Sequence, residues 1–349
     1  FGLFCGMQVF TAVVAGDYLF FTADDGTNGT ELWRSDGTEA GTVMVKDINT
    51  GATWDSSSDP YHLTVMGGNI YFAADNGTNT QELWRSDGTE SGTVMLMSFV
   101  DMGAQSYAAT DPFAIVGDAF YFNGNDGTHG RELWKSDGTE AGTVMVKDIN
   151  TECLGGSCTQ TRGSSPQHLA AVGETLYFRA DDGTHGGELW KSDGTESGTV
   201  MVKDIRPDGA SGRPLYLTAV GDLLFFRAVG SYDNGNDWDL WRSDGTEAGT
   251  IQLTSSDFQS PNAFKAIGDI LFFRFQDTTA NGHEMWRSDG TVAGTEMIDI
   301  TPDPYRSSNS FGFTLLGSTV YFSADNALGN APGCLLYTSD AADEEDSVD

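Results

Sequence analysis

A twelve-residue string that returns along the chain constrains the fold more than any other feature. The string Glu-Leu-Trp-Arg-Ser-Asp-Gly-Thr-Glu-Ala-Gly-Thr starts at Glu31. Three close copies and two looser ones start at Glu82, Glu132, Glu188, Asp239 and Glu284. Their tryptophans, 51, 50, 56, 51 and 45 residues apart, are Trp33, Trp84, Trp134, Trp190, Trp241 and Trp286. A chain that repeats at this period builds one supersecondary unit several times.

Each repeat reads as four β-strands separated by turns. In the first repeat the expected strands are Gln8–Val14, Tyr18–Ala23, Glu31–Ser35 and Val43–Ile48. The run Leu19-Phe20-Phe21 is apolar on both faces, which is typical of a strand that is covered on both sides. Asp36-Gly37 supplies a turn, because glycine adopts a positive φ at little cost. No stretch has a helical period, so the sequence predicts an all-β fold.

The repeats need one another, because a single four-stranded meander cannot bury both of its faces. A ring of such units gives each one two neighbours, and four-stranded blades of this length build β-propellers. We therefore expect one β-propeller over residues 1–333, with six complete blades and the first half of a seventh. The expected blades are residues 7–50, 58–100, 110–150, 164–207, 212–255, 259–301 and, in part, 308–333.

The six repeated tryptophans are expected to be packing anchors between blades. Each aromatic side chain of this kind buries roughly 150–250 Å². The alternative is that they stack on a ligand.

A second recurring string follows the first. Glu188–Ile205 contains Glu-Leu-Trp-Lys-Ser-Asp-Gly-Thr and then Val-Met-Val-Lys-Asp-Ile. On these strings the chain resembles the ELWxxDGT repeat family, from about Val9 to Asn326. The resemblance implies repeat arrays of a bacterial type in exported or cell-surface proteins, without an established general activity. It therefore implies architecture and an extracellular or cell-surface location more than chemistry.

Both ends of the sequence depart from the repeat. The chain begins at Phe1 without an initiating Met, so we expect that the true N-terminus is missing. Phe313–Gly317 and Val320–Asp325 match the first two strands of a seventh blade. Residues 334–349 have no counterpart in the repeat, and we expect a non-native, adapter-like tail or a disordered terminus there. The total number of blades is left open.

The charge is strongly acidic, at -33, with a sequence pI of about 4.1. This charge argues against nucleic acid or an anionic membrane as a partner. No apolar run approaches the roughly 18 residues that a membrane span needs. Protein or glycan ligands and cations remain as partners, although a saline habitat would also explain the acidity.

The chain has four cysteines, and Cys153 and Cys158 bracket a short turn. We expect a disulfide between these two, as in an exported protein.

Acidic Gly loops between the second and third strands are the candidate metal sites. Their oxygen-rich side chains could bind Ca²⁺, which takes six to eight oxygen ligands. The candidate ligands are Asp25, Asp126, Asp182, Asp233 and Asp237. The alternative, which we favour, is that these side chains cap turns. No cofactor is expected to be required.

Other polar residues offer weaker candidates. His129 and His185 occupy matching loop positions and could share a metal, although variable loop polarity explains them as well. The glutamates that open the repeats, such as Glu31 and Glu132, return in nearly every blade, whereas a glycosidase needs one asymmetric pair of acids. The sequence therefore predicts a structural role for them, and no catalytic residues.

Two tryptophans, Trp54 and Trp238, fall outside the repeat, in or beside loops, and are candidate ligand-binding residues. Packing over the blade rim is the alternative for both.

The function favoured by the sequence is a non-catalytic extracellular module for binding, adhesion or scaffolding within a larger protein. One alternative is a structural array that Ca²⁺ stabilises. The other is a glycan lyase or hydrolase with a site on the acidic loop face, near Asp233–Asp239.

Overall fold

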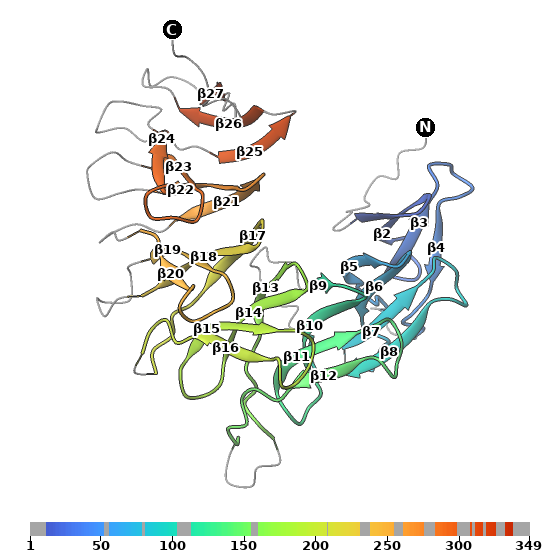
Figure 1. Cartoon of the computed structure of the whole chain (residues 1–349). Helices are drawn as coiled ribbons and strands as arrows, with labels where there is room; N and C mark the ends of the chain where they lie inside the picture. The colour runs from blue at the N-terminus through green and yellow to red at the C-terminus, as the bar shows by residue number, and fades with distance from the viewer. Residues whose placement is uncertain are drawn as a thin grey trace. The chain divides into compact units, whose positions relative to one another are not determined.

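The computed structural model describes most of the chain, and the described part is all-β (Figure 1). The described residues are 12–51, 56–78, 81–102, 113–154, 160–207, 209–230, 238–254, 261–275, 283–298, 308, 311–316, 319–325 and 332–337. Every regular element within these ranges is a β-strand, which confirms the fold class that the turn residues and apolar runs predict. No helix there is long and apolar enough to cross a membrane.

The strands form consecutive sheets, one to each repeat, with neighbouring strands in sequence order. The first sheet contains β1 (Ala12–Ala15), β2 (Tyr18–Asp24), β3 (Thr30–Ser35) and β4 (Val43–Lys46). The second contains β5 (Tyr61–Met66), β6 (Asn69–Ala74), β7 (Gln81–Ser86) and β8 (Val94–Phe99). The third contains β9 (Ala114–Val116), β10 (Ala119–Asn125), β11 (Arg131–Ser136) and β12 (Val144–Lys147). The fourth contains β13 (Gln167–Val172), β14 (Thr175–Asp181), β15 (Gly187–Ser192) and β16 (Val200–Lys203).

Three further sheets follow the same plan. The fifth contains β17 (Leu215–Val220), β18 (Leu223–Val229), β19 (Trp238–Ser243) and β20 (Ile251–Gln252). The sixth contains β21 (Asn262–Ile267), β22 (Ile270–Phe275), β23 (Glu284–Ser288) and β24 (Glu296–Ile298). The last has three described strands, β25 (Phe311–Leu316), β26 (Thr319–Asp325) and β27 (Pro332–Tyr337).

The strand β27 bears on the expected tail. It pairs antiparallel with β26, and Phe322 lies opposite Leu335, as Phe72 lies opposite Trp84 in the second sheet. The expected tail boundary at residue 334 therefore falls inside a strand. Whether residues 334–349 are native stays a prediction, and residues after Tyr337 lie outside the described part.

The first strand of several sheets carries a β-bulge that the sequence pattern does not predict. In β5 the pairing with β6 shifts between Tyr61 and Thr64, and His62 has a φ of 60°. Positive φ values recur at the equivalent residues His168, Tyr216, Ala263 and Gly312. Bulky residues rarely adopt this conformation, and a bulge of this kind bends the strand and re-aims its side chains.

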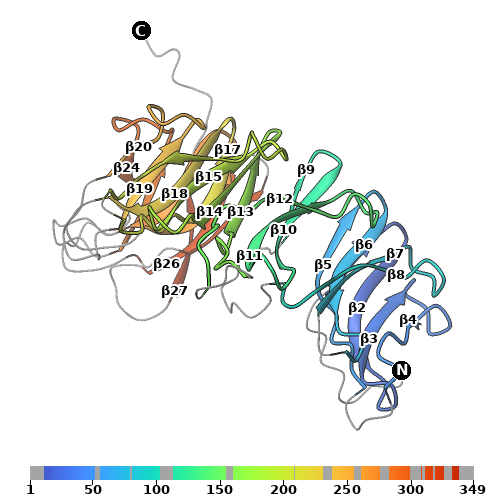
Figure 2. The ribbon, with the colours of Figure 1, turned by 90° about the horizontal axis from the view of Figure 1, so that it is seen from below.

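The chain divides into two compact units. Unit 1 comprises residues 1–184 and 192–200, and unit 2 comprises residues 185–191 and 201–349. Within each unit the first strands of successive sheets lie side by side, as β1 with β5 and β17 with β21. Figure 2 shows the second sheet (β5 to β8) beside β2, β3 and β4 of the first sheet in unit 1. The expected single ring over residues 1–333 and its blade number stay predictions.

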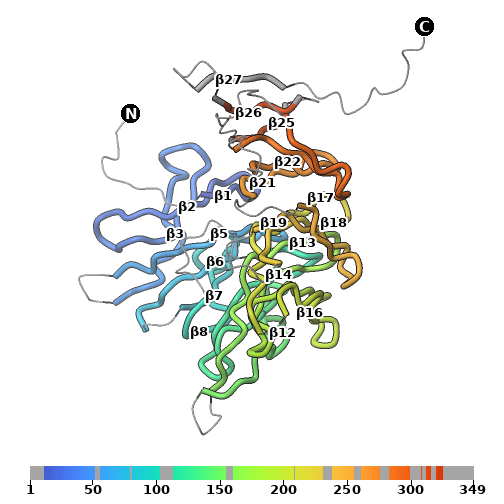
Figure 3. The backbone as a smooth tube through the Cα atoms, turned by 90° about the vertical axis from the view of Figure 1, so that its left-hand side faces the viewer, coloured from blue at the N-terminus to red at the C-terminus, as the bar shows by residue number. Residues whose placement is uncertain are grey.

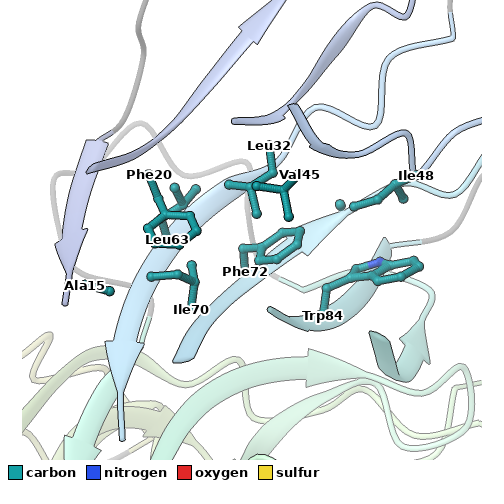
Figure 4. Close-up of a cluster of buried hydrophobic side chains, with 10 residues drawn as sticks. Ala15, Phe20, Leu32, Val45, Ile48, Leu63, Ile70, Phe72 and Trp84 are labelled. Carbon is teal, nitrogen blue, oxygen red and sulfur yellow. The ribbon is translucent and has the colours of Figure 1, made fainter. Parts of the chain in front are cut away.

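The core of each unit lies between successive sheets. In unit 1 one cluster joins Phe20, Leu32 and Val45 of the first sheet to Phe72 and Trp84 of the second (Figure 4). The next cluster places Trp134 of the third sheet among residues of the second, and in unit 2 Phe225 of the fifth sheet packs with Phe273 of the sixth. Burial of each such aromatic contributes on the order of 4–6 kcal/mol, as an upper bound.

The turn between the third and fourth strands explains most of the repeated string. In the third repeat Asp137 Oδ1 accepts hydrogen bonds from the N–H (2.9 Å) and Oγ1 (2.7 Å) of Thr139. The Oγ1 atom of Thr139 in turn accepts the N–H of Gly142 at 3.0 Å. Ser136 Oγ and Thr143 Oγ1 lie 2.8 Å apart and close the turn. The same bonds recur in the other repeats, so Ser-Asp-Gly-Thr-x-x-Gly-Thr is a self-contained folding motif.

The glycine of this turn gives a direct test. A Cβ atom on Gly142 would lie 2.0 Å from Oδ1 of Asp137, so alanine there must displace the carboxylate from its bonds. Gly142→Ala is expected to lower the free energy of unfolding by about 1–3 kcal/mol in a denaturant titration. Ala141→Ser is the control, because serine occupies this position in the second and fourth repeats. Equal stability of the two variants would contradict this account of the motif.

Basic side chains of one sheet clamp the turn of the next sheet. Nζ of Lys46 donates to the carbonyl of Thr93 (3.0 Å), and Nη1 of Arg85 donates to the carbonyl of Gly138 (3.1 Å). In unit 2, Nζ of Lys191 donates to the carbonyl of Gly245 at 2.9 Å. Figure 3 shows the consecutive sheets that these clamps join within each unit. Several of the 18 lysine and arginine side chains of this acidic chain therefore hold neighbouring sheets together.

Candidate functional site

Three of the five predicted Ca²⁺ ligands lie in described loops between second and third strands, and their carboxylates are bonded within these loops. They are Asp25, Asp126 and Asp182. Asp25 Oδ1 accepts the N–H of Thr27 (2.8 Å) and of Asn28 (2.9 Å). The bond from the Asn28 N–H has the largest influence and, with the other loop bonds, holds the pKa of Asp25 below its usual value. Asp182 accepts the N–H of Thr184 at 2.9 Å. These bonds are those of turn-capping side chains.

The third repeat places a histidine in this loop. Asp126 Oδ1 accepts the N–H of Thr128 (2.8 Å) and of His129 (2.9 Å), and Oδ2 lies 2.7 Å from Nδ1 of His129. The hydrogen bond with Asp126 raises the pKa of His129. In the first repeat Asn28 Nδ2 donates to Asp25 Oδ2 at 2.9 Å. The imidazole of His129 thus takes the place of the Asn28 amide in the same side-chain hydrogen bond to the loop aspartate, which favours a structural role for His129.

The Ca²⁺ site stays a prediction. Among the residues that the structure describes, no three His, Cys, Asp or Glu side chains are grouped so that they could hold a metal ion. Asp233 and Asp237 lie outside the described residues, so a Ca²⁺ site there stays a prediction.

The repeated glutamates bind the connection between one sheet and the next. Glu31 is fully buried, and its Oε2 accepts Oγ–H of Ser58 (2.5 Å) and the N–H of Ile48 (3.2 Å). Glu132 accepts the N–H of Asn150 (3.1 Å) and both the N–H (2.8 Å) and Oγ–H (2.5 Å) of Ser164. Each glutamate therefore latches the segment that leads into the following sheet.

Burial raises the pKa of the glutamates that form these latches. Removal from water raises the pKa of Glu31 and of Glu132 to about 7, although hydrogen bonds from Ser58 and Ser164 act in the opposite direction. A raised pKa often marks a catalytic acid, but a latch of this kind recurs in the first, third, fourth and sixth repeats. Glu188 likewise accepts the N–H of Ile205 at 2.9 Å. The raised pKa of Glu31 and of Glu132 is therefore a consequence of their burial in the latch.

Of the two predicted ligand-binding tryptophans, Trp54 lies outside the described residues. Trp238 is the first residue of β19, opposite Val229, and its side chain is half-buried. Cζ of Arg227 lies 4.5 Å from the ring centroid of Trp238 and 4.5 Å from that of Tyr216. Trp238 is thus part of a packed cluster with Tyr216 and Arg227.

The expected disulfide is described at one end. Cys153 is disulfide-bonded, and Cys158 lies outside the described residues. The connection that carries Cys153 is pinned to the third repeat, because the N–H of Thr161 donates to the carbonyl of Thr128 at 2.9 Å.

A groove that sequence reasoning missed lies between the second and third sheets of unit 1, on the face of the turns that join first to second and third to fourth strands. Its volume is about 550 Å³, within the range of ~300–1,000 Å³ that is usual for ligand sites. Its lining includes Val65, Met66, Ile115, Tyr71, Arg85, Asp118 and Asp137. The available signal was the β-branched pair Val65 and Ile115, which the fifth and sixth repeats replace by Ala219 and Ala266.

Comparisons with known proteins show similarity of fold only. No family model matches the chain, and no curated protein matches it. The β-propeller domain of the Trilobed protease from Pyrococcus furiosus has 11% identity, a TM-score of 0.46 and 96% of each chain covered. A prolyl endopeptidase has 11% identity and a TM-score of 0.47, with 91% of this chain and 46% of that chain covered. The GH74 xyloglucanase from Xanthomonas campestris has 13% identity and a TM-score of 0.46, with 95% and 55% covered.

The chain therefore spans about half the length of the endopeptidase and the xyloglucanase. Likenesses at this level of identity concern the fold alone, and the activities of those enzymes carry no argument about this chain.

Proposed function

We propose that this chain is a non-catalytic binding module of an exported or cell-surface protein, built as a β-propeller of ELWxxDGT-type repeats. Its blades would form a ring, with seven as the simplest number. Protein or glycan ligands are the proposed partners, and nucleic acid is not.

The observation that carries the proposal is that the repeated polar side chains form hydrogen bonds within the fold. Asp137 and its equivalents form the same turn hydrogen bonds in six repeats. Glu132 and its equivalents in the first, fourth and sixth repeats bond to the connection that leads into the following sheet. Groups that are already bonded in turns and latches are poorly placed to act on a substrate. The features that differ between repeats, such as the groove of unit 1, are then the surfaces on which function depends.

Location outside the cytosol is supported by the disulfide-bonded Cys153, because disulfides persist mainly in oxidising compartments. The chain also has an excess of acidic residues. A ligand surface on this module would therefore favour cationic or neutral partners.

A turnover assay tests the proposal. Purified chain is expected to hydrolyse neither ester nor glycan probes, and His129→Asn is expected to leave its melting temperature unchanged, because Asn28 forms the same side-chain hydrogen bond in the first repeat. Turnover that co-purifies with the chain and disappears in His129→Asn or Asp126→Asn would overturn it. Glu140→Gln, at an exposed position, serves as the control variant.

A further inference from the structure

The groove between the second and third sheets has an acidic rim. Asp118 is exposed, and its carboxylate accepts no hydrogen bond from the residues that the structure describes. Asp137 Oδ1 is bonded to Thr139, and these bonds hold the pKa of Asp137 below its usual value, so its carboxylate is ionised at neutral pH. The rim therefore presents two negative charges to solvent.

The floor of the groove is polar but already engaged. Nη1 of Arg85 donates to the carbonyl of Gly138 at 3.1 Å, which fixes the guanidinium beneath the turn. Tyr71 is buried, and a Cβ on Gly138 would lie 2.1 Å from its hydroxyl oxygen. Arg85 offsets only one of the two rim charges, so the groove keeps a net negative charge.

The walls of the groove are apolar. Val65 and Met66 come from β5, and Ile115, which is 39% exposed, comes from β9. In the fifth and sixth repeats of unit 2, alanine stands at the positions of Val65 and Ile115. The second and third repeats therefore combine a partly buried Val65 and an exposed Ile115 with the two carboxylates of Asp118 and Asp137, a combination that the fifth and sixth repeats lack.

We propose that this groove receives a lysine or arginine side chain from a basic segment of a partner protein. The aliphatic stem of such a side chain packs on Val65, Met66 and Ile115 while its charged head reaches Asp118 and Asp137. The inference rests on the proposed binding function and names the chemistry of one partner. Charge complementarity of this kind also raises the rate of association with a basic partner.

The test measures binding of one peptide to the full chain by fluorescence anisotropy. The probe is fluorescein-labelled Gly-Leu-Lys-Leu-Lys-amide, and the matched probe has norleucine in place of each lysine. The lysine peptide is expected to bind more tightly, and to lose affinity as ionic strength rises, because exposed charges are screened. Asp118→Asn is expected to weaken binding about two- to fivefold, and Ile115→Ser about fivefold.

Matched substitutions in unit 2 make the result specific. Asp269→Asn removes a charge from the equivalent turn of the sixth repeat, and Val292→Ser removes an exposed apolar side chain. Neither is expected to change the affinity. Equal weakening by Asp269→Asn and Asp118→Asn, equal binding of both peptides, or no binding would each overturn the groove as the site. Enzymatic turnover would overturn the proposed function instead, so the two failures are distinguishable.

Discussion

Replacement of Glu132 by alanine is expected to lower the free energy of unfolding by about 3 kcal/mol or more. The carboxylate is buried and accepts the N–H groups of Asn150 and Ser164 and the hydroxyl of Ser164. Alanine leaves these donors buried without an acceptor and opens a cavity, and each unsatisfied donor costs roughly 1–3 kcal/mol. Relief from burying a carboxylate offsets part of this loss.

Hydrogen exchange of backbone amides measures this loss of stability residue by residue. The amides of Asn150 and Ser164 should lose protection in Glu132→Ala, and the connection between the third and fourth sheets should open first. Ser164→Ala removes only the hydroxyl bond, so a loss of about 1 kcal/mol is expected for it. Glu140→Ala, at an exposed turn position, is the control. Unchanged protection of both amides in Glu132→Ala would show that the latch does not hold the connection.

The strands and the turn between the third and fourth strands follow from local sequence. The run Leu19-Phe20-Phe21 lies in β2, as its apolar pattern predicts. Gly37 has a φ of 89°, as the Asp-Gly turn requires. Both features depend on residues that are close together in the chain, so a pattern of a few residues is enough to predict them.

The bulge in the first strand could not be predicted in the same way. His62 and Tyr216 stand in runs that read as ordinary strands, yet both have positive φ. Such a conformation is unfavourable for these residues by itself, and it persists only where the surrounding structure imposes it. The information lies in the packing between repeats and not in the residue type.

In the candidate sites, too, some features follow from local sequence and others from packing between repeats. The sequence indicated that the repeated glutamates are structural, but their partners Ser58 and Ser164 are 27 and 32 residues away from Glu31 and Glu132. The groove needs Val65 and Ile115 from different repeats, so no single motif contains it. Trp238 was expected in or beside a loop because it falls outside the repeat, and pairing with Val229 makes it the first residue of β19.

Thermal stability is expected to fall as the pH rises from about 5 to about 8, and two glutamates are the cause. The pKa of Glu31 and of Glu132 is about 7 in the folded chain against 4.5 for an exposed glutamate. Between these values the folded chain binds more protons than the unfolded chain, so stability decreases with pH. The contribution is fully present below about pH 4.5 and is lost above about pH 7. A shift of this size corresponds to roughly 3 kcal/mol for each glutamate.

The double variant Glu31→Gln and Glu132→Gln isolates this effect, since glutamine resembles the protonated acid at every pH. Its melting temperature is expected to change less between pH 5 and pH 8 than that of the original chain, at constant ionic strength. Histidines such as His129, whose pKa is raised by the hydrogen bond with Asp126, are the same in both proteins. Glu39→Gln with Glu140→Gln is the matched control, because both side chains are exposed. Equal pH dependence of the original chain and the latch variant would mean that Glu31 and Glu132 are ionised throughout. The hydrogen bonds from Ser58, Ile48 and Ser164 would then outweigh the cost of burial, and the latch would be anionic at every pH in the range.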